Sequence, residues 1–425
     1  MTEVEEKDFF RDNEVQADPY PYLEALRGQC PVLREPHHNV VMVTGYDEAV
    51  QVFQDSDTFS SCASVTGPFP GFPVPLEGDD VSALIEEHRH ALPMSDQIIT
   101  FDPPLHTAHR ALLMKLITPK RLKENEATMW QLADQLLDTF LAPGEGEFIS
   151  GFAAPYTLLV IADLLGVPDE DRDSVARGLQ HGGGVGGTGD EAMAHNPLEF
   201  LYDTFTAYIE DRRRKPKHDV LTGMATATFP DGTTPTAADV ARIACNVFSA
   251  GQETTVRLLS TALKVLADDQ ELQGLLRRER DRIPNFVEEV LRIDGPIKGD
   301  FRLSRVPTTL GGVDLPAGTT VMLLNGAANR DPRHFENPDT FDAARQNARH
   351  HIAFGRGVHT CPGSPLARAE ARASLERILD RTEEIKLSDQ HHGPAGDRHY
   401  DYVPTFILRG LTQLHLEFTP KEGVR

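Results

Sequence analysis

Residues 354–363 read Phe-Gly-Arg-Gly-Val-His-Thr-Cys-Pro-Gly, and this decapeptide constrains the chain more than any other stretch. A thiolate that ligates a metal has lost its proton, and backbone N–H groups together with the positive end of a helix stabilise its charge. Pro362 suits a first helical position, and an alanine-rich run with helical apolar spacing follows it. Gly355 and Gly357 allow the tight backbone that a flat macrocycle lying close to the chain requires. The loop therefore predicts a thiolate metal site at Cys361, with an ordinary buried cysteine as the alternative.

A second pattern, Glu289-Val-Leu-Arg292, lies in a segment with helical periodicity at about residues 284–293. Side chains at i and i+3 lie on one face of a helix, so these two residues are able to pair. An exposed pair of this kind contributes about 0.3 kcal/mol and has no function. Alone, the motif does not distinguish a structural site from a solvated helix face.

The longest predicted helix ends near residue 267, with Thr234 as its cap and Pro235 at its first position. Its apolar middle contains the polar sequence Gly-Gln-Glu-Thr-Thr at residues 251–255. Buried polar groups cost free energy unless they are paired, so this patch favours a functional role over simple packing. The alternative is a threonine hydroxyl that bonds back to its own helix.

A third pattern, Asp-Pro-Pro-Leu-His at residues 102–106, leads into another predicted helix. His106 and Arg110 are spaced i and i+4, which places them on one helical face. A cation on an amphipathic helix is ordinarily solvated. The spacing alone therefore assigns no role to either residue.

In this order, the patterns resemble the cytochrome P-450 family of haem-thiolate monooxygenases. The decapeptide meets all six fixed positions of the family's Phe-Gly-x-Gly-x-His/Arg-x-Cys-x-Gly pattern. Further similarity at residues 312–318 and 327–332 extends the resemblance from about Tyr20 to the end of the sequence. It implies a cytochrome P-450 fold that encloses a haem.

The resemblance also implies roles for individual residues. Cys361 would ligate the iron of haem b, and Thr254 with Glu253 would be the catalytic pair that guides protons to bound O2. Many bacterial members have Asp where this chain has Glu253. Arg345 would be the third partner of the acid-x-x-Arg pair, with a role in folding and haem incorporation. The cofactor-binding residues would be His106, Arg110, Ala250, Gly251, Arg302, Ala353, Phe354, Gly355, His359, Cys361 and Gly363.

The substrate pocket would lie on the iron face opposite the cysteine. A stretch rich in Pro and Gly at residues 67–75 is either a mobile cover carrying aromatic contacts or an ordinary surface loop. The candidate lining residues are Val247, Phe248, Ile297, Lys298 and Ile407.

Lys298 departs from the family pattern, because members commonly place an apolar side chain at this position. One hypothesis is that Lys298 pairs with a carboxylate or another acceptor on the substrate, since a desolvated cation needs a partner. The alternative is that it turns toward Asp294 or water.

Hydrophobic periodicity predicts a mainly α fold with a small β-rich part. We expect a single domain over residues 1–425, because no segment has the composition of a linker. Strand-like runs occur at residues 40–44, 319–323 and 405–418. The helical part would cover about 100–295 and 361–380, and the β-rich part about 20–60, 300–325 and 384–419. Residues 182–189 are glycine-rich but lack the Lys-Ser/Thr of a phosphate loop, so a loop between helices is expected.

The four cysteines at positions 30, 62, 245 and 361 form no Cys-x-x-Cys pair, so neither a disulfide framework nor a zinc site is predicted. A reducing cytoplasm is the simple interpretation. The N-terminus is acidic and the sequence has no run of about 18 apolar residues, so we expect no membrane association. The net charge of −23 argues against nucleic-acid binding.

The predicted reaction is insertion of one oxygen atom from O2 into an apolar small molecule, such as a terpenoid, steroid, fatty acid or aromatic compound. Electrons would come from NAD(P)H through a reductase and a ferredoxin or similar carrier. A peroxide-driven enzyme is one alternative, although such members typically lack the acid-Thr pair. A non-catalytic haem-thiolate protein that binds or senses ligands is another. The arginines at 277, 278, 280 and 282 form either a docking patch for the carrier or a solvated helix face.

Overall fold

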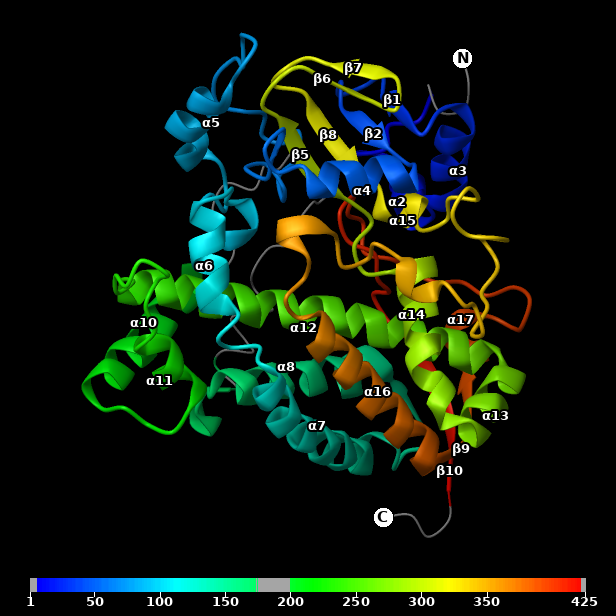
Figure 1. Cartoon of the computed structure of the whole chain (residues 1–425). Coiled ribbons are helices and arrows are strands. Elements are labelled where there is room, and N and C mark those ends of the chain that lie inside the picture. Colours follow the sequence, from blue (N-terminus) through cyan, green and yellow to red (C-terminus); the bar gives the residue numbers. More distant parts are fainter. Residues whose placement is uncertain (1–5, 173, 175–198, 422–425) are drawn as a thin grey trace.

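The computed structural model describes residues 6–172, 174 and 199–421. Figure 1 shows most of the helices gathered on one side of the molecule and most of the strands, with the N-terminal helices, on the other. The predicted glycine-rich loop at 182–189 lies outside the described residues. The helices are α2 (Asn13–Ala17), α3 (Tyr20–Gln29), α4 (Tyr46–Gln54), α5 (Ser82–His88), α6 (Leu105–Leu113), α7 (Pro119–Phe140), α8 (Ala154–Leu165), α10 (Glu199–Arg214), α11 (Val220–Ala225), α12 (Ala237–Asp268), α13 (Gln270–Arg278), α14 (Ile283–Asp294), α15 (Asn325–Ala328), α16 (Ser364–Arg381) and α17 (Asp389–His392).

Three small sheets accompany the helices. The five-stranded sheet has the order β1-β2-β8-β5-β3, in which only the β2–β8 pair is parallel. The other sheets are β4-β10-β9 and the two-stranded β6-β7, and both are antiparallel. The strands are β1 (Val32–Arg34), β2 (Val41–Val43), β3 (Phe59–Ser60), β4 (Glu145–Glu147), β5 (Asp300–Ser304), β6 (Thr308–Leu310), β7 (Val313–Leu315), β8 (Thr320–Leu323), β9 (Thr382–Leu387) and β10 (His415–Pro420).

α12 crosses the helical side of the molecule (Figure 1) and carries the predicted polar patch in its middle. Its cap is Thr236, which forms a capping box with Asp239, so the predicted start at Thr234 and Pro235 was two residues too early. A reciprocal pair of side-chain bonds satisfies two exposed N–H groups, which explains why the helix begins there. Val240, Ile243 and other apolar residues of α12 belong to the main hydrophobic core.

α16 begins at Ser364 rather than at Pro362, and Pro365 occupies its first turn. Cys361 therefore precedes the helix by a short turn. Pro365 is tolerated in the first turn because the N–H groups there have no acceptor within the helix. α14 agrees closely with the helix predicted at residues 284–293.

The β-rich part differs in detail from the prediction. Residues 20–60 contain the helices α3 and α4 besides three short strands, because both segments have helical apolar spacing. The run at 405–418 is largely irregular: it forms isolated bridges at Leu408 and Leu411 before β10 begins. No helix among the described residues combines the length and the apolarity needed to cross a membrane.

The acid-x-x-Arg pair is buried, not exposed. Both Glu289 and Arg292 have side chains with no solvent exposure, and two hydrogen bonds of 2.8 Å join them. Nε of Arg345 donates to Oε1 of Glu289 at 3.0 Å. The predicted third partner is therefore confirmed. Carbonyl oxygens of the segment before the cysteine loop accept further bonds from both arginines, so this network fixes that segment against α14.

Candidate active site

The cysteine loop is shaped by glycines at left-handed backbone angles. Gly355 has φ 64° and Gly357 has φ 69°, a region that strains any residue with a side chain. A Cβ on Gly357 would also stand 2.2 Å from the carbonyl oxygen of Phe53, so α4 lies against this point of the loop. The N–H of Cys361 donates to the carbonyl of Phe354 at 2.8 Å, which closes the loop.

The surroundings of the Cys361 thiol combine opposing effects. Burial raises the pKa of the thiol, while the N–H groups of Gly363 and Ser364 and the guanidinium groups of Arg110 and Arg368 favour the thiolate. Such donors are what a thiolate ligand needs, because they lower the cost of the negative charge. The predicted arrangement of a cysteine next to backbone donors before a helix is present.

Four of the residues predicted to bind the cofactor, His106, Arg110, Arg302 and His359, form contacts around the cysteine loop. The imidazole rings of His106 and His359 have centroids 4.0 Å apart. Nη2 of Arg110 donates to the carbonyl of Thr360 at 2.5 Å, and Nη1 of Arg302 donates to the carbonyl of Phe301 at 2.6 Å. Thus α6, β5 and the cysteine loop bring together residues that are far apart in the sequence.

Burial makes this cluster unfavourable for positive charge. It lowers the pKa of His106 to about 4, with a further contribution from Arg110. Burial, followed by the charges of Arg302 and His106, lowers the pKa of His359 to about 2. The pKa values of Arg110 and Arg302 are also lowered by burial. Among the described residues, neither arginine forms an ion pair with a carboxylate.

The polar patch of α12 shows two local interactions. The hydroxyl of Thr254 donates to the carbonyl of Ala250 at 2.7 Å, which is the back-bonding alternative considered above. Glu253 pairs with Arg257, one turn further along the helix. Gly251 lets α8 approach, since a Cβ there would stand 3.2 Å from Cδ1 of Ile161. The helix is continuous through this patch.

The candidate pocket residues are mostly buried. Phe248 has no exposed surface and packs 6.0 Å from the ring of Phe205 in α10. Val247 is 8% exposed, Ile407 is 6% exposed, and Ile297 forms a bridge with Leu408. Ile297 and Ile407 therefore belong to adjacent segments, whereas Phe248 faces the helical core.

Lys298 turns toward Gln16 rather than toward Asp294 or water. Its Nζ donates to Oε1 of Gln16 at 2.7 Å and approaches the carbonyl of the same residue at 3.4 Å. The residue is 2% exposed, and burial lowers the pKa of its ammonium group to about 7. Asp294 is engaged by Tyr20 and Arg409. The side-chain amide of Gln16 thus accepts the hydrogen bond that, under the first hypothesis, the Lys298 ammonium group would donate to a substrate carboxylate.

The N-terminal segment is part of the same region. Phe10 is 1% exposed and forms ring contacts with Phe69, Phe301 and Phe406. Phe69 lies in the stretch predicted as a mobile cover, and His38 contacts both Phe10 and Phe69. The N-terminal segment therefore joins that stretch to the turn containing Phe406.

Sequence reasoning missed Arg368 and Glu288. Nε and Nη2 of Arg368 donate to the two carboxylate oxygens of Glu288, and the guanidinium lies 4.6 Å from the ring centroid of Phe354. Burial alone would raise the pKa of Glu288, but bonds from His351 and Arg368 outweigh it and lower the pKa to about 2. The available signal was the position of Arg368 in the first turns of the helix that follows Cys361.

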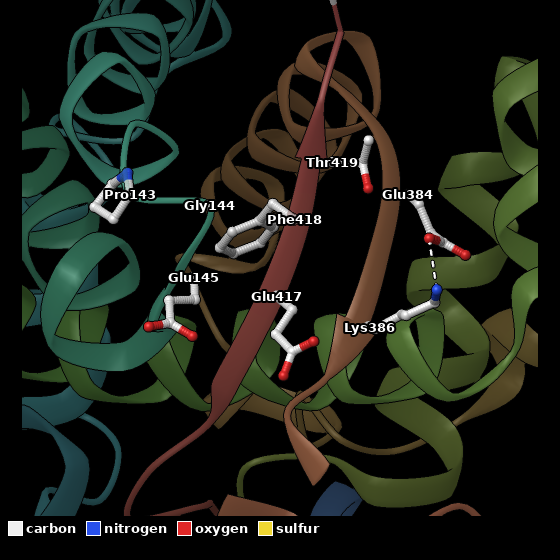
Figure 2. A pocket seen from close by; sticks show the side chains of 8 residues that line it. All are labelled: Pro143, Gly144, Glu145, Glu384, Lys386, Glu417, Phe418 and Thr419. Atoms are coloured by element: carbon white, nitrogen blue, oxygen red, sulfur yellow. Dashed lines mark ion pairs between the residues drawn. The ribbon is translucent and has the colours of Figure 1, made fainter. Parts of the chain in front are cut away.

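A surface cavity of about 290 Å³ lies elsewhere, on the sheet formed by β4, β10 and β9. Figure 2 shows its side chains, with the ion pair between Glu384 and Lys386. None of its lining residues belongs to the cysteine loop, to α6 or to α12. We therefore assign the chemistry to the cluster around Cys361 and not to this cavity.

Comparisons with known proteins agree with this assignment. A sequence model described as "Cytochrome P450" matches residues 190–392. Cytochrome P450 144 of Mycobacterium tuberculosis is 31% identical over 98% of this chain and 92% of its own length. The chain belongs to the cytochrome P450 family and is a P450 monooxygenase of bacterial type.

Solved structures confirm the fold. The substrate-free form of cytochrome P450 CYP150A6 from Mycobacterium marinum is 54% identical, with a TM-score of 0.93 over 98% of this chain and 99% of that one. CYP109E1 from Bacillus megaterium, solved in complex with corticosterone, is 27% identical, with a TM-score of 0.79 over 95% and 99% of the two chains. The predicted cytochrome P-450 fold is therefore confirmed.

The residues present fit the haem that the family implies. Nδ1 of His106 and Nε2 of His359 are buried and have no hydrogen-bond partner among the described residues. Arg110 and Arg302 add two cations that lack a carboxylate partner there. Buried cations and unpaired donors need anions, and the two propionates of a haem would supply them.

Proposed function

We propose that this P450 inserts one atom of O2 into an apolar small molecule and that a ferredoxin-type carrier delivers its electrons one at a time. The carrying observation is the pairing of two features around Cys361. The backbone N–H groups of Gly363 and Ser364 favour the thiolate of Cys361, and among the described residues His106 and His359 each keep a buried ring nitrogen without a hydrogen-bond partner. The first suits an iron ligand and the second suits propionates.

The cofactor we propose is haem b held by Cys361 without a covalent link to the macrocycle. The four cysteines of the chain lie at separate positions, and none forms the Cys-x-x-Cys-His sequence of covalent haem attachment. When bound, the haem would supply O2 activation, which a strongly donating thiolate favours. Arg110, Arg302 and the two imidazoles would hold its propionates.

Proton delivery is the second task of the chain. We assign it to Glu253 and Thr254, because they are adjacent polar residues in the middle of α12. The Thr254 hydroxyl, bonded to the carbonyl of Ala250, keeps its oxygen lone pairs available to accept a proton from water. The half-exposed Glu253 carboxylate would exchange protons with solvent, a general acid and base role.

An apolar substrate is supported by the chemistry of the residues predicted to line the pocket and of two neighbouring aromatic residues. Val247, Ile297 and Ile407 are aliphatic, and Phe69 and Phe406 contribute aromatic rings. Corticosterone, present in the CYP109E1 structure, supports a steroid as one member of the substrate class. The Lys298–Gln16 bond removes the reason for proposing an acidic substrate.

For the electron carrier, we propose docking beside the cysteine loop. Val358 is 41% exposed within the loop, and Met114, one turn after Arg110, is 42% exposed. The alternative patch at residues 277–282 is internally engaged: Arg280 pairs with Asp380 and Arg282 with Glu279. An exposed apolar spot near the iron ligand suits a transient contact better than a neutralised helix face.

The first experiment tests the metal ligand. The reduced wild-type protein under carbon monoxide should absorb at about 450 nm, as expected for thiolate-bound haem. Cys361→Ser should lose this band, while the matched control Cys30→Ser should keep it. A folded wild-type sample without the band would overturn the proposal.

The second experiment tests substrate and chemistry. Ferric protein is titrated with steroid, terpenoid, fatty acid and aromatic acid sets, with corticosterone as the named steroid probe, and the Soret shift is recorded. Binders are then incubated with NAD(P)H, a ferredoxin and its reductase. Oxygenated product in step with reductant supports the monooxygenase. A Soret shift without product supports a ligand-binding or sensing protein, and product from peroxide alone supports the peroxide-driven alternative.

A further inference from the structure

Arg257 lies on α12 one turn after Glu253. Its side chain is 8% exposed, whereas that of Glu253 is 41% exposed. Nη2 of Arg257 donates to Oε1 of Glu253. A buried guanidinium needs an anionic partner, and within the described part of the chain its recorded ion pair is with Glu253.

Gly410 provides the space for this arginine. A Cβ on Gly410 would stand 2.6 Å from Cγ and 2.6 Å from Nη1 of Arg257. The backbone of Gly410 lies outside the left-handed region, so its conformation does not require glycine. The missing side chain at position 410 therefore serves the packing of Arg257.

The segment behind Arg257 is well fixed. The N–H of Val403 donates to the carbonyl of Gly410 at 3.0 Å. Arg409 is bound to Asp294 at 3.0 Å, and Leu408 pairs with Ile297. Arg257 therefore packs against the fixed turn that also contains Ile407, and its guanidinium is directed toward Glu253.

The contact uses one carboxylate oxygen. The hydrogen bond from Arg257 engages Oε1 of Glu253, so Oε2 remains able to exchange a proton with water. The carboxylate belongs to the residue directly before Thr254. An arginine cannot act as the proton donor in this path because its guanidinium stays protonated. Its contribution must come from orientation.

We propose that Arg257 is a positioning residue for proton delivery, which fixes the orientation of the carboxylate of Glu253, the residue directly before Thr254. The inference rests on the proposed proton path through these two residues. In each turnover, O2 takes two electrons from the carrier and two protons from solvent. One oxygen atom leaves as water, and the other converts a C–H bond of the substrate into C–OH. Glu253 passes on each proton and regains one from solvent, so it is unchanged overall.

The test compares Arg257→Gln, Arg257→Lys and Gly410→Ala with Glu253→Gln. Arg381→Gln is the control, because it removes a mostly buried guanidinium that pairs with Asp138 at the far end of α16. The substrate probe is corticosterone, and the same measurements are repeated without substrate. Reductant, oxygen, peroxide and product are measured together, in water and in deuterium oxide, after the 450 nm band has been recorded.

We expect Arg257→Gln to keep the 450 nm band and the probe affinity within about twofold, but to release at least about three times more peroxide per reductant. Without substrate, its ratio of reductant to oxygen should fall from that of water formation, two, toward that of peroxide, one. The solvent isotope effect should rise. Arg257→Lys should restore part of the coupling, and adding Arg257→Gln to Glu253→Gln should change little. A crystal structure of Arg257→Gln should show Glu253 displaced.

Two outcomes would overturn the inference in distinguishable ways. If Glu253→Gln is uncoupled while Arg257→Gln matches the wild type, the proton path stands and Arg257 has no part in it. If Glu253→Gln is itself fully coupled, the proton path fails and the inference fails with it. Should Arg257→Gln lose its haem, Gly410→Ala decides, because it displaces the guanidinium and keeps its charge. Coupled turnover in Gly410→Ala would then refute the proposal.

Discussion

The imidazole rings of His106 and His359 lie 4.0 Å apart, which joins α6 to the cysteine loop. Each ring keeps one buried nitrogen without a hydrogen-bond partner among the described residues. The arrangement is costly by itself, since an unpaired buried polar group loses its hydration without replacement. It becomes favourable when an anionic group lies against both rings. Haem binding should therefore stabilise this part of the fold.

The first prediction concerns the pH dependence of the haem-free protein. The pKa of His106 is lowered to about 4 in the folded state, against about 6.5 in an unfolded chain. Between these values the unfolded state binds more protons, so stability falls as the pH is lowered from about 6.5 toward 4, by at most about 1.4 kcal/mol per pH unit. Urea unfolding at several pH values should show a smaller slope for His106→Gln than for the wild type. Equal slopes would contradict the assignment.

The second prediction concerns Lys298. Its folded pKa of about 7 lies below the ordinary value of 10.5, so the unfolded state binds more protons between these limits and stability should rise with pH across that window. Lys298→Met should remove this part of the pH dependence. It should also leave unchanged the relative affinity for a fatty acid and its methyl ester, because Gln16 already occupies the ammonium group. A selective loss of acid binding would restore the substrate-pairing hypothesis.

The third prediction concerns the buried network of α14. Arg292→Ala leaves the carboxylate of Glu289 buried with Arg345 as its remaining guanidinium partner, which should cost about 3–5 kcal/mol of unfolding free energy. The control is Arg280→Ala, which breaks a partly exposed pair and should cost less than about 1 kcal/mol. Denaturant midpoints and haem content of the purified proteins measure both effects. Comparable losses in the two variants would mean that the network is not a special anchor.

The fourth prediction concerns Gly357. Gly357→Ala combines a left-handed backbone with a Cβ that would stand 2.2 Å from the carbonyl oxygen of Phe53. We expect the loop to shift and the 450 nm band to be lost or reduced. Gly312→Ala is matched in backbone angle, with φ 83°, but has open space around it, so only the strain of about 1–2 kcal/mol applies. An intact 450 nm band in Gly357→Ala would show that α4 moves to accommodate the added Cβ and that the loop keeps its position.

The fifth prediction concerns Thr254. Thr254→Ala should retain haem and consume reductant, but divert much of the reductant to peroxide, because the hydroxyl that accepts and passes on protons is gone. Thr255→Ala, at a neighbouring buried position, is the matched control. Product, peroxide and reductant are measured in the same reaction. Tightly coupled turnover in Thr254→Ala would remove it from the proposed path.

Local patterns predicted much of this molecule because the signals are short in range. The glycines of the loop, the helix after Cys361 and the i, i+3 pair at Glu289 each follow from spacing within a few residues. The start of α12 at Thr236 was missed because two threonines, Thr234 and Thr236, flank Pro235 and either one is able to cap a helix. Only the reciprocal bond between Thr236 and Asp239 decides between them.

Partners brought together by tertiary structure could not be predicted from the sequence. Nothing in the spacing of Lys298 indicates that Gln16 in the N-terminal helix would bind it. The burial of Arg292 depends on a segment 46 to 48 residues later in the chain, whose carbonyl groups accept its hydrogen bonds. Hydrophobic periodicity identifies the buried face of a helix, but it does not identify the distant residues that pack against that face or bond to its polar groups.

The fit between Gly410 and Arg257 links two positions that are remote in the sequence. A larger residue at 410 excludes the arginine, and a shorter residue at 257 leaves room for a side chain at 410. Substitutions at positions 257 and 410 should therefore occur together among related P450 chains. Such covariation would indicate a contact that no single sequence reveals.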